Sequence, residues 1–522
     1  MNSTSALQCF DRPALKKQLE HDTFDLAVIG GGITGAGIAR DAAMRGLRVA
    51  LLEAQDFASG TSSKSSKMIH GGLRYLLSGE LSVMKESVAE RQAVHTIAPH
   101  LAEKNHFIVT ARSWAESLKL RMALSVYEYF GRVAKQDRHV VWSVEELQRR
   151  EPHLNTEGVY CALVYTEYLT DDARLTLANL RAAQEAGAVV ANYYRVDSIS
   201  KKGGLTTLKG TSQLPEDNSH INVKAKLVVN AAGPWVDQLC QQEDPTQKPR
   251  LALSRGIHVV VPHAKLPISH TVVMYAPDKR TIFAVPRGDT TYLGTTDEFY
   301  PDQAYWPAVY QRDVDYLLTT CQRYFPGHSL SSSDVVAVWS GLRPLVGSAD
   351  QKATDISRKD EIWVGPLGIL SIAGGKLSAY RAMAERVVDR VVALGGFDAQ
   401  PCRTANTPLP GGIFNHNASA KDLPATLIQR YGFEANTLAN MGGDVEAEVI
   451  FAVLVEGAVR LEDYWVRRSS RAWFDVDAGM ATLAPAASKM ALLLGWSAAR
   501  QQQEIDRCLE IHRASLQYLH TQ

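Results

Sequence analysis

The fold is decided by the stretch Asp25-Leu-Ala-Val-Ile-Gly-Gly-Gly-Ile-Thr-Gly-Ala-Gly-Ile-Ala39, which is followed by Arg48-Val-Ala-Leu-Leu-Glu53. Residues 26–29 are a short apolar run, which predicts a buried parallel strand. Three glycines then form the pattern G-x-G-x-x-G: Gly30, Gly32 and Gly35. The first glycine permits a tight turn, the second lets a pyrophosphate approach the backbone, and the third lets a helix lie close to the strand.

A helix, a second strand and an acid complete this unit. The helix is expected at residues 33–45, where Gly46 suits a left-handed cap, and the strand at residues 48–52. Glu53 ends that strand, about 20 residues after the third glycine, where a carboxylate can accept both ribose hydroxyls. A glycine pattern alone is weak, but this order of elements predicts a dinucleotide site and not a purely structural turn. The acid favours FAD or NAD over NADP.

Composition bounds the class of protein. The chain has 522 residues, enough for two or three domains, and its 56 basic and 56 acidic residues give a net charge of zero, which does not indicate nucleic-acid binding. Its six cysteines are scattered without a C-x-x-C pair, which predicts neither a disulfide framework nor a zinc site and fits a reducing compartment. No secretory signal and no membrane span are expected, so the protein is predicted to be soluble or bound to a membrane surface.

A polar segment follows the glycine unit. Residues 59–75 read Ser-Gly-Thr-Ser-Ser-Lys-Ser-Ser-Lys-Met-Ile-His-Gly-Gly-Leu-Arg-Tyr. Their hydroxyls and lysines suit the backbone and phosphates of an extended ligand. The alternative is a flexible linker, against which the anchoring residues Met68, Ile69 and Leu73 argue.

Two later turns repeat the strand-and-glycine pattern. Residues 227–235 and 368–378 are each an apolar strand followed by small residues, and the second is expected to start a helix near Gly375 that runs to about Leu394. Lys376 adds a positive charge at that helix start, where an anionic atom belongs, although a solvated lysine is the alternative. A long ligand across several turns favours FAD over NAD, because this lysine would stabilise the negative charge of a reduced flavin.

The rest of the chain predicts three further units. Helices are expected at residues 81–98, 114–134 and 171–186, the second being basic and amphipathic, so that it either lies on a membrane or covers a core. Strands are expected at residues 189–194 and beyond, and a β-rich region at 250–340 predicts an antiparallel substrate layer. The sequence Pro408-Leu-Pro-Gly-Gly412 marks a boundary before a helical C-terminal region, clearest at residues 446–455 and 496–518.

Cationic side chains lie beside turns and strand ends. Several arginines that converge on a pocket imply an anionic substrate, because a guanidinium matches phosphate or carboxylate. Any single one of them could instead form a surface ion pair, and His258 could be a core histidine or the acceptor of a hydroxyl proton. The candidate substrate residues are Arg74, Tyr75, His258, Arg280, Arg343, Lys376 and Arg381.

Eight blocks of the sequence resemble the FAD-dependent sn-glycerol-3-phosphate dehydrogenases of the aerobic, respiratory type. The most specific are Ile69-His-Gly-Gly-Leu-Arg-Tyr75 and Gly374-Gly-Lys-Leu377. The resemblance covers nearly the whole chain and is carried by residues 28–39, 61–75, 171–175, 230–235, 294–297, 340–344, 374–381 and 461–468.

This resemblance implies an α/β fold with a glutathione-reductase-like, Rossmann-type FAD-binding domain, a β-sheet substrate domain and a helical C-terminal cap. The implied division is a leader at 1–22, an FAD domain at 23–407 interleaved with substrate-binding segments at about 76–165 and 250–340, and a cap at 408–522. The implied activity is oxidation of glycerol 3-phosphate to dihydroxyacetone phosphate, with electrons passed from FAD to membrane quinone. The implied location is peripheral, on the inner, cytoplasmic face of the cell membrane, and the chain is expected to contact lipid and to form a homodimer.

The resemblance also assigns residues. Arg74, Tyr75 and Lys376 look like phosphate or flavin-edge residues, Arg343 like the residue beside the reacting hydroxyl, and His258 like the histidine of a Lys-Gly-x-His block; Arg280 and Arg381 are further substrate candidates. Arg74, His258, Arg343 and Lys376 are the expected catalytic residues. FAD contacts are expected from Gly30, Gly31, Gly32, Ile33, Thr34, Gly35, Glu53, Ala54, Thr61, Ser62, Ser66, Lys67, His70, Gly71, Gly72, Val196, Ala232, Gly233, Trp235, Gly375, Lys376, Leu377 and Ser378. No metal ligand is expected.

The chain departs from the family pattern at three places. Arg255 replaces the lysine of that block, Ser378-Ala379 stands where two threonines are usual, and Glu167 replaces an aspartate. Charge is kept at Arg255 and Glu167, whereas the missing hydroxyl at Ala379 could alter a hydrogen bond near the flavin. Two rival functions stay open at this point: an oxidase that passes electrons to oxygen, and a flavin-binding redox sensor without turnover.

Overall fold

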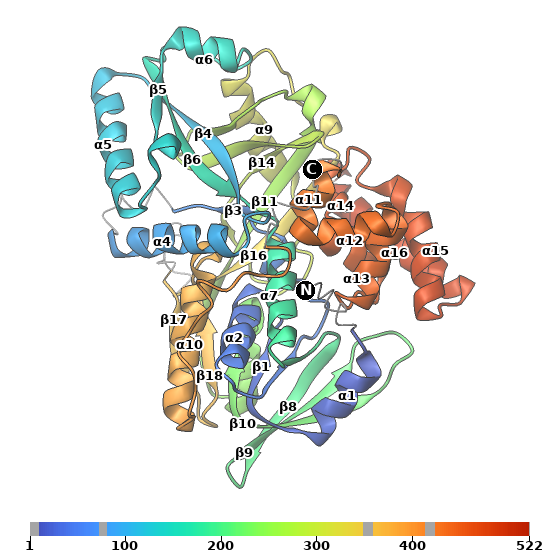
Figure 1. Cartoon of the computed structure of the whole chain (residues 1–522). Coiled ribbons are helices and arrows are strands. Elements are labelled where there is room, and N and C mark those ends of the chain that lie inside the picture. Colours follow the sequence, from blue (N-terminus) through green and yellow to red (C-terminus); the bar gives the residue numbers. More distant parts are fainter. Residues whose placement is uncertain (1–9, 72–80, 348–358, 413–422, 521–522) are drawn as a thin grey trace.

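A computed structural model describes residues 10–71, 81–347, 359–412 and 423–520. Figure 1 shows two β-sheets that lie one above the other, with a group of helices from the C-terminal region against their flank. No helix among the described residues is long and apolar enough to cross a membrane. The five cysteines in this part of the chain are all free.

The first sheet is a parallel layer around the glycine-rich unit. Its strand order is β17-β18-β10-β1-β2-β7, with an antiparallel hairpin, β8 and β9, attached to β10. Strands β18, β10, β1, β2 and β7 run parallel, so their carboxyl ends meet at one edge. The bounds are β1 Thr23–Ile29, β2 Val49–Leu52, β7 Val189–Ala191, β8 Tyr194–Lys202, β9 Leu205–Ser212, β10 His220–Asn230, β17 Glu361–Val364 and β18 Leu370–Ala373.

Three helices cover this sheet. Helix α2 (Ile33–Met44) packs between α7 (Asp172–Glu185) and α10 (Tyr380–Gly395), as Figure 1 shows. Small side chains such as Ala36, Ala39 and Ala42 are buried along α2, which lets its backbone lie close to its neighbours. A short helix, α1 (Arg12–His21), precedes β1. One difference from the sequence prediction is that residues 189–194 contain the whole of β7 and the first residue of β8, because the chain turns at Tyr193 with φ +60°.

The second sheet is mostly antiparallel. Its order is β15-β11-β14-β13-β12-β4-β6-β3, and β16 and β5 pair with β11 and β6. The bounds are β3 Met68–Ile69, β4 Glu103–Ala111, β5 Val140–Trp142, β6 Cys161–Leu169, β11 Leu251–Pro262, β12 Thr271–Tyr275, β13 Thr281–Arg287, β14 Thr290–Gly294, β15 Glu298–Phe299 and β16 Ala337–Val346. The predicted domain boundaries stay a proposal.

Four helices accompany this sheet: α4 Leu81–Ile97, α5 Trp114–Phe130, α6 Val144–Arg150 and α9 Gln311–Tyr324. Helix α9 lies within the region that the sequence predicted as β-rich. It forms because Val314, Leu317 and Cys321 make a buried stripe that packs against β11, β12 and β14.

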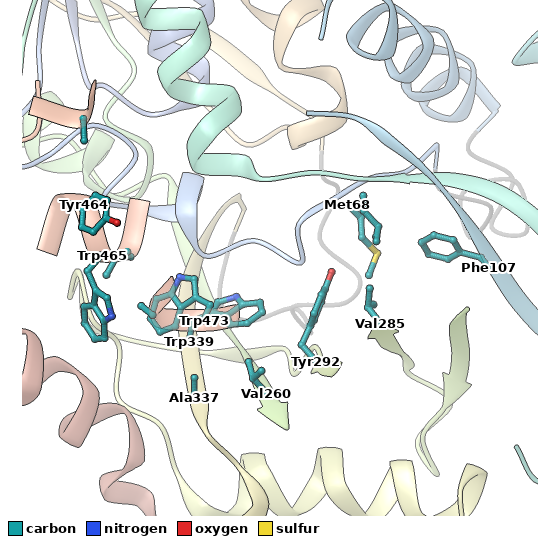
Figure 2. Close-up of a cluster of buried hydrophobic side chains, with 14 of the residues drawn as sticks. Met68, Phe107, Val260, Val285, Tyr292, Ala337, Trp339, Tyr464, Trp465 and Trp473 are labelled. Carbon is teal, nitrogen blue, oxygen red and sulfur yellow. The ribbon is translucent and has the colours of Figure 1, made fainter. Parts of the chain in front are cut away.

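The C-terminal region is helical, as predicted. Its helices are α11 Ala425–Tyr431, α12 Ala435–Asn440, α13 Val445–Leu454, α14 Arg471–Phe474, α15 Met480–Leu494 and α16 Ala498–Leu516, with a π-helical turn at Asp463–Arg468. Figure 2 shows how this region joins the second sheet: Trp473 lies against Trp339 of β16, with ring centroids 5.8 Å apart. These aromatic side chains belong to one buried apolar cluster.

A buried ionic cluster joins the C-terminal region to the first sheet. Asp56, in the loop after β2, accepts hydrogen bonds from Arg467 and Arg468 of the π-helical turn. Arg467 also donates to Asp463 at 2.8 Å, whose carboxylate accepts from the hydroxyl of Tyr193 at 2.6 Å. These side chains are almost completely removed from solvent, so each charge depends on its partner.

Candidate functional site

A cavity of about 570 Å³ lies along the carboxyl ends of the parallel strands and continues to the second sheet. Its walls come from the start of α2, the end of β2, the polar segment after residue 59, the turn after β10, strands β11 and β16, and the turn after β18. An elongated cavity with polar walls at such an edge is where an α/β sheet binds a dinucleotide.

The glycine turn requires glycine at two places. Gly30 has φ +114°, and a Cβ there would lie 2.5 Å from the carbonyl oxygen of Ala231. A Cβ on Gly35 would lie 1.9 Å from the carbonyl oxygen of Gly30. The turn is therefore packed as tightly as the sequence pattern predicts, and it leaves space beside the start of α2 for a pyrophosphate.

Glu53 directly follows β2 and lies in the cavity wall. One of its carboxylate oxygens accepts a hydrogen bond from the Gly31 N–H at 2.7 Å, and the other accepts one from the Gln55 N–H at 2.8 Å. These two bonds fix the carboxylate and leave lone pairs for two hydroxyl groups. Burial raises the pKa of Glu53, and the two backbone N–H groups oppose that effect. The carboxylate is thus placed as the ribose acid of a dinucleotide site.

The described part of the polar segment, residues 59–71, is built into the site and is not a flexible linker. Ser62 Oγ accepts the N–H of Ile33 at 2.9 Å at the start of α2, and Thr61 donates to the carbonyl of Leu342 in β16 at 2.6 Å. Ser66 Oγ lies 2.9 Å from His258 Nε2 in β11. The segment therefore connects α2 with the second sheet along one wall of the cavity.

His258 and Arg343 come from neighbouring strands at the second-sheet end of the cavity. The imidazole of His258 is buried and stacks on Trp339, with centroids 4.7 Å apart and an interplanar angle of 12°. Burial lowers the pKa of His258 well below its usual value, and the positive charges of Arg343 and Lys67 add to this. The ring is therefore neutral at physiological pH. Among the described residues its Nδ1 atom has no hydrogen-bond partner.

Arg343 is held by the turn after β14. Its Nη1 atom donates to Asp297 Oδ1 at 3.1 Å, and its Nη2 atom donates to Thr295 Oγ1 at 2.9 Å and to the carbonyl of Thr296 at 3.2 Å. Its guanidinium lies over Gly256, where a Cβ would be 2.2 Å from Nη2. Arg343 thus occupies one fixed position at the cavity wall.

The turn after β18 differs from the prediction in its helix start. Helix α10 begins at Tyr380, after a 3-10 turn at Leu377–Ala379, and not near Gly375. Gly374 and Gly375 have φ values of +78° and +81°, which an α-helix cannot contain. Lys376 nevertheless lines the cavity with a buried Nζ atom.

Most predicted site residues that the structure describes line this cavity. They are Gly30, Gly32, Ile33, Thr34, Glu53, Ala54, Thr61, Ser62, Ser66, His70, Val196, Ala232, Gly233, Trp235, His258, Arg343, Gly375, Lys376, Leu377 and Ser378.

Six others do not line the cavity: Gly31, Gly35, Lys67, Gly71, Arg280 and Arg381. Lys67 forms a buried ion pair with Asp172 at 2.6 Å, and Arg381 pairs with Glu90 at 2.5 Å. Arg280 donates to the carbonyl of Asp297 at 3.0 Å. Three predicted residues, Gly72, Arg74 and Tyr75, lie outside the described residues.

Lys64 and Tyr305 also line the cavity. Lys64 is one of the two lysines of the polar segment that were expected near a ligand but was not among the assigned site residues, and Tyr305 was missed. Lys64 Nζ donates to the carbonyl oxygens of Ser59 at 2.6 Å and Tyr305 at 2.5 Å, and burial lowers its pKa to about 7. Tyr305 stacks on Trp235 with centroids 4.3 Å apart. Lys64 belongs to a block that the sequence singled out, whereas Tyr305 lies in a loop without a pattern.

Comparisons with known proteins agree with this geometry. A family model described as FAD dependent oxidoreductase matches residues 25–381, and one described as the C-terminal domain of alpha-glycerophosphate oxidase matches residues 402–501. An aerobic glycerol-3-phosphate dehydrogenase from Staphylococcus aureus (strain USA300) is 36% identical over 508 residues, covering 90% of this chain and 91% of the relative.

Solved structures give the same picture. The glycerol-3-phosphate dehydrogenase from Bacillus halodurans complexed with FAD is 31% identical, with a TM-score of 0.81 over 98% of this chain and 99% of that one. The L-alpha-glycerophosphate oxidase from Mycoplasma pneumoniae with FAD bound is 19% identical, with a TM-score of 0.55 over 74% of this chain and 99% of that one, and it shares the fold. The chain therefore belongs to the family of FAD-dependent oxidoreductases that contains the aerobic glycerol-3-phosphate dehydrogenases, and FAD is its cofactor.

Proposed function

We propose that this protein oxidises sn-glycerol 3-phosphate to dihydroxyacetone phosphate and passes the electrons to a membrane quinone. The observation that carries the proposal is the second-sheet end of the cavity. There a neutral, buried histidine and a fixed arginine lie in one wall, and Lys376 lies in the same cavity. This combination suits an anionic substrate that must lose a hydroxyl proton. The relatives named above carry the same substrate in their names.

Different residues of the chain have different roles in this reaction. FAD, which the glycine turn and Glu53 would hold, would supply the hydride acceptor and the route by which electrons leave for the next acceptor. His258, being neutral, can take the hydroxyl proton, and Ser66 at 2.9 Å from Nε2 holds its ring in place. The charge of Arg343 stabilises negative charge on the oxygen as that proton leaves. Lys376 adds a positive charge that attracts the anionic substrate.

The test is an anaerobic titration. The purified protein should show an oxidised flavin spectrum that bleaches with glycerol 3-phosphate and not with glycerol or glycerol 2-phosphate. A flavin spectrum that does not bleach would refute the substrate. Stoichiometric hydrogen peroxide in air, with no faster turnover when a quinone is added, would refute the quinone and make the protein an oxidase.

The proposed location at the membrane is supported by the outer face of α5. Six large side chains on this face are exposed, and all of them except Tyr129 follow one another at intervals of four residues. We call this set the α5 patch: Trp114, Leu118, Met122, Val126, Tyr129 and Phe130. The core-facing side of the same helix is a different stripe, with Leu120, Leu124 and Tyr127 buried. The helix therefore covers the core, as one of the two predictions had it, and it does so with this second stripe, while the outer stripe stays exposed.

The α5 patch fits an anionic lipid surface. Trp114 is 65% and Tyr129 79% exposed, and the exposed cations Lys119, Arg121 and Arg132 lie on or next to the same helix. Aromatic and apolar side chains beside cations are the composition of a surface-bound amphipathic helix. Figure 1 shows α5 at the edge of the molecule, on the side away from the C-terminal helices. We propose that this helix attaches the protein to the cytoplasmic face of the cell membrane.

Charge reversal tests this attachment. The triple change Lys119→Glu, Arg121→Glu and Arg132→Glu should abolish sedimentation with vesicles that contain anionic lipid. The matched control reverses three exposed lysines of the β8–β10 hairpin region, Lys202, Lys209 and Lys224, and should still bind. Equal binding by both variants would refute α5 as the attachment. Sedimentation equilibrium in detergent would test the proposed homodimer.

A further inference from the structure

A buried carboxylate contacts the arginine at the reacting end of the cavity. Asp297 is 9% exposed, and its Oδ1 atom accepts from Arg343 Nη1 at 3.1 Å. The same oxygen accepts a short hydrogen bond from the hydroxyl of Ser254, the residue opposite Arg343 in the β11–β16 register. The carboxylate therefore lies between two neighbouring strands and contacts a group from each.

The backbone that carries Asp297 is fixed from behind. Arg280 Nη1 donates to the carbonyl of Asp297 at 3.0 Å, and the preceding residues Thr295 and Thr296 both accept from Arg343 Nη2. The guanidinium also lies directly over Gly256. The Arg343 guanidinium is therefore in contact with the turn at residues 295–297 along one edge and with Gly256 of β11 on one face. These contacts restrict both its position and the orientation of its plane.

The charge of Asp297 limits what Arg343 can bind well. A carboxylate at hydrogen-bond distance offsets most of the guanidinium charge, and it would repel a phosphate dianion placed beside the pair. A hydroxyl oxygen that becomes negative only during the reaction is affected less, because it needs a correctly aimed N–H donor more than it needs net charge. A paired arginine is thus better suited to the reacting oxygen than to the phosphate.

We propose that Asp297 is a positioning residue that orients Arg343 and reserves it for the reacting oxygen of the substrate, so that the phosphate is bound by other cations. This inference rests on the proposed oxidation of glycerol 3-phosphate. It also gives Arg280 a role outside the cavity lining, where it holds the backbone of Asp297 and does not touch the substrate.

The test compares two adjacent carboxylates. Asp297→Asn keeps the shape and one acceptor oxygen but removes the charge. Glu298→Gln is the matched control, because its side chain is 43% exposed and pairs with Arg255 and Arg312 instead of Arg343. Both variants, loaded with FAD, are mixed anaerobically with glycerol 3-phosphate in a stopped-flow instrument, and the limiting rate of flavin bleaching and the substrate Kd are measured at several pH values.

Asp297→Asn should lower the limiting rate at least tenfold while the substrate Kd changes less than threefold, and Glu298→Gln should match the wild type. The acidic limb of the rate profile should also move to lower pH, because loss of a nearby negative charge lowers the pKa of the proton acceptor. A purely structural role would not move this limb. An Asp297→Asn enzyme with an unchanged rate, or with a tenfold weaker Kd at an unchanged rate, would overturn the proposal.

A second variant keeps the proposal testable if Asp297→Asn folds poorly. Ser254→Ala removes the hydroxyl that donates to Asp297 and that accepts a long hydrogen bond from Arg343 Nη1 at 3.4 Å. It should lower the limiting rate in the same direction by a smaller factor, and an unchanged rate here would also count against the proposal. The proposed function is judged on the wild type alone: if its flavin does not bleach with glycerol 3-phosphate, that function fails. If the wild type bleaches and both variants behave like it, only the role of Asp297 fails.

Discussion

Replacing Gly256 by alanine should disable Arg343 without removing any catalytic side chain. The new methyl carbon would lie 2.2 Å from Arg343 Nη2 and 2.6 Å from Thr295 Oγ1. Both are side-chain atoms that can move, so the strand can keep its backbone and its pairing with β16. We therefore expect a folded, FAD-binding protein in which the guanidinium is displaced.

The size of the effect follows from these distances. Non-bonded heavy atoms ordinarily stay about 3.5 Å apart, so Nη2 must move by about 1.3 Å. The bond to Thr295 Oγ1, now 2.9 Å long, would then be broken. A lost hydrogen bond of a charged group costs about 1.5–3 kcal/mol. If the transition state loses that much stabilisation, kcat/KM should fall about 10- to 150-fold.

The assay is steady-state oxidation of glycerol 3-phosphate with a soluble quinone, with flavin content and thermal midpoint measured on the same preparation. Gly327→Ala is the control, because a Cβ there has no atom within 4 Å. The thermal midpoint of Gly256→Ala should stay within a few degrees of the wild type. Wild-type kcat/KM in a fully flavinated Gly256→Ala protein would refute the placement of Arg343 at the reacting oxygen.

Three further changes test other parts of the structure. Gly35→Ala should raise the FAD Kd at least 100-fold in a fluorescence titration, because its Cβ would lie 1.9 Å from the carbonyl oxygen of Gly30 and force the turn open; retained affinity would contradict the tight turn. Asp56→Asn should lower the free energy of unfolding by about 3–5 kcal/mol, seen as a lower thermal midpoint, because two buried guanidinium groups lose their carboxylate. Burial lowers the pKa of His100 to about 3, so the unfolded chain takes up a proton below about pH 6.5 that the folded chain does not. This group should lower the free energy of unfolding by about 2 kcal/mol between pH 6.5 and pH 5, and thermal midpoints of His100→Asn should show a shallower loss over that range.

The glycine unit was predictable because its determinants are local. The strand, turn and helix depend on residues close together in the chain, and the predicted helix at residues 33–45 ends within one residue of α2. Glu53 could be placed for the same reason, since the length of one helix and one strand decides where it lies.

Other features depend on how distant segments meet. Asp297 and Arg343 are brought together because β15, which directly follows Asp297, and β16 both pair with β11, and the sequence does not state this pairing. On α5 the periodicity of Leu118 and Met122 was visible, but Leu120 and Leu124 form a second stripe, and only packing shows which one is buried. Helix α9 had a sequence signal in its buried stripe that the β-rich interpretation of residues 250–340 overlooked.

The contact between Asp56 and Arg467 has a consequence for how the protein is made. The two residues are 411 positions apart in the chain. At about 5–20 residues per second, synthesis of that length takes about 20 to 80 s, during which the carboxylate after β2 has neither of its arginines. Until Arg467 and Arg468 have been synthesised and have left the ribosome, the Asp56 carboxylate of the cofactor-binding layer stays exposed to solvent. Its final packing is thus a late event of biosynthesis, and a chain that stalls before residue 467 cannot complete it.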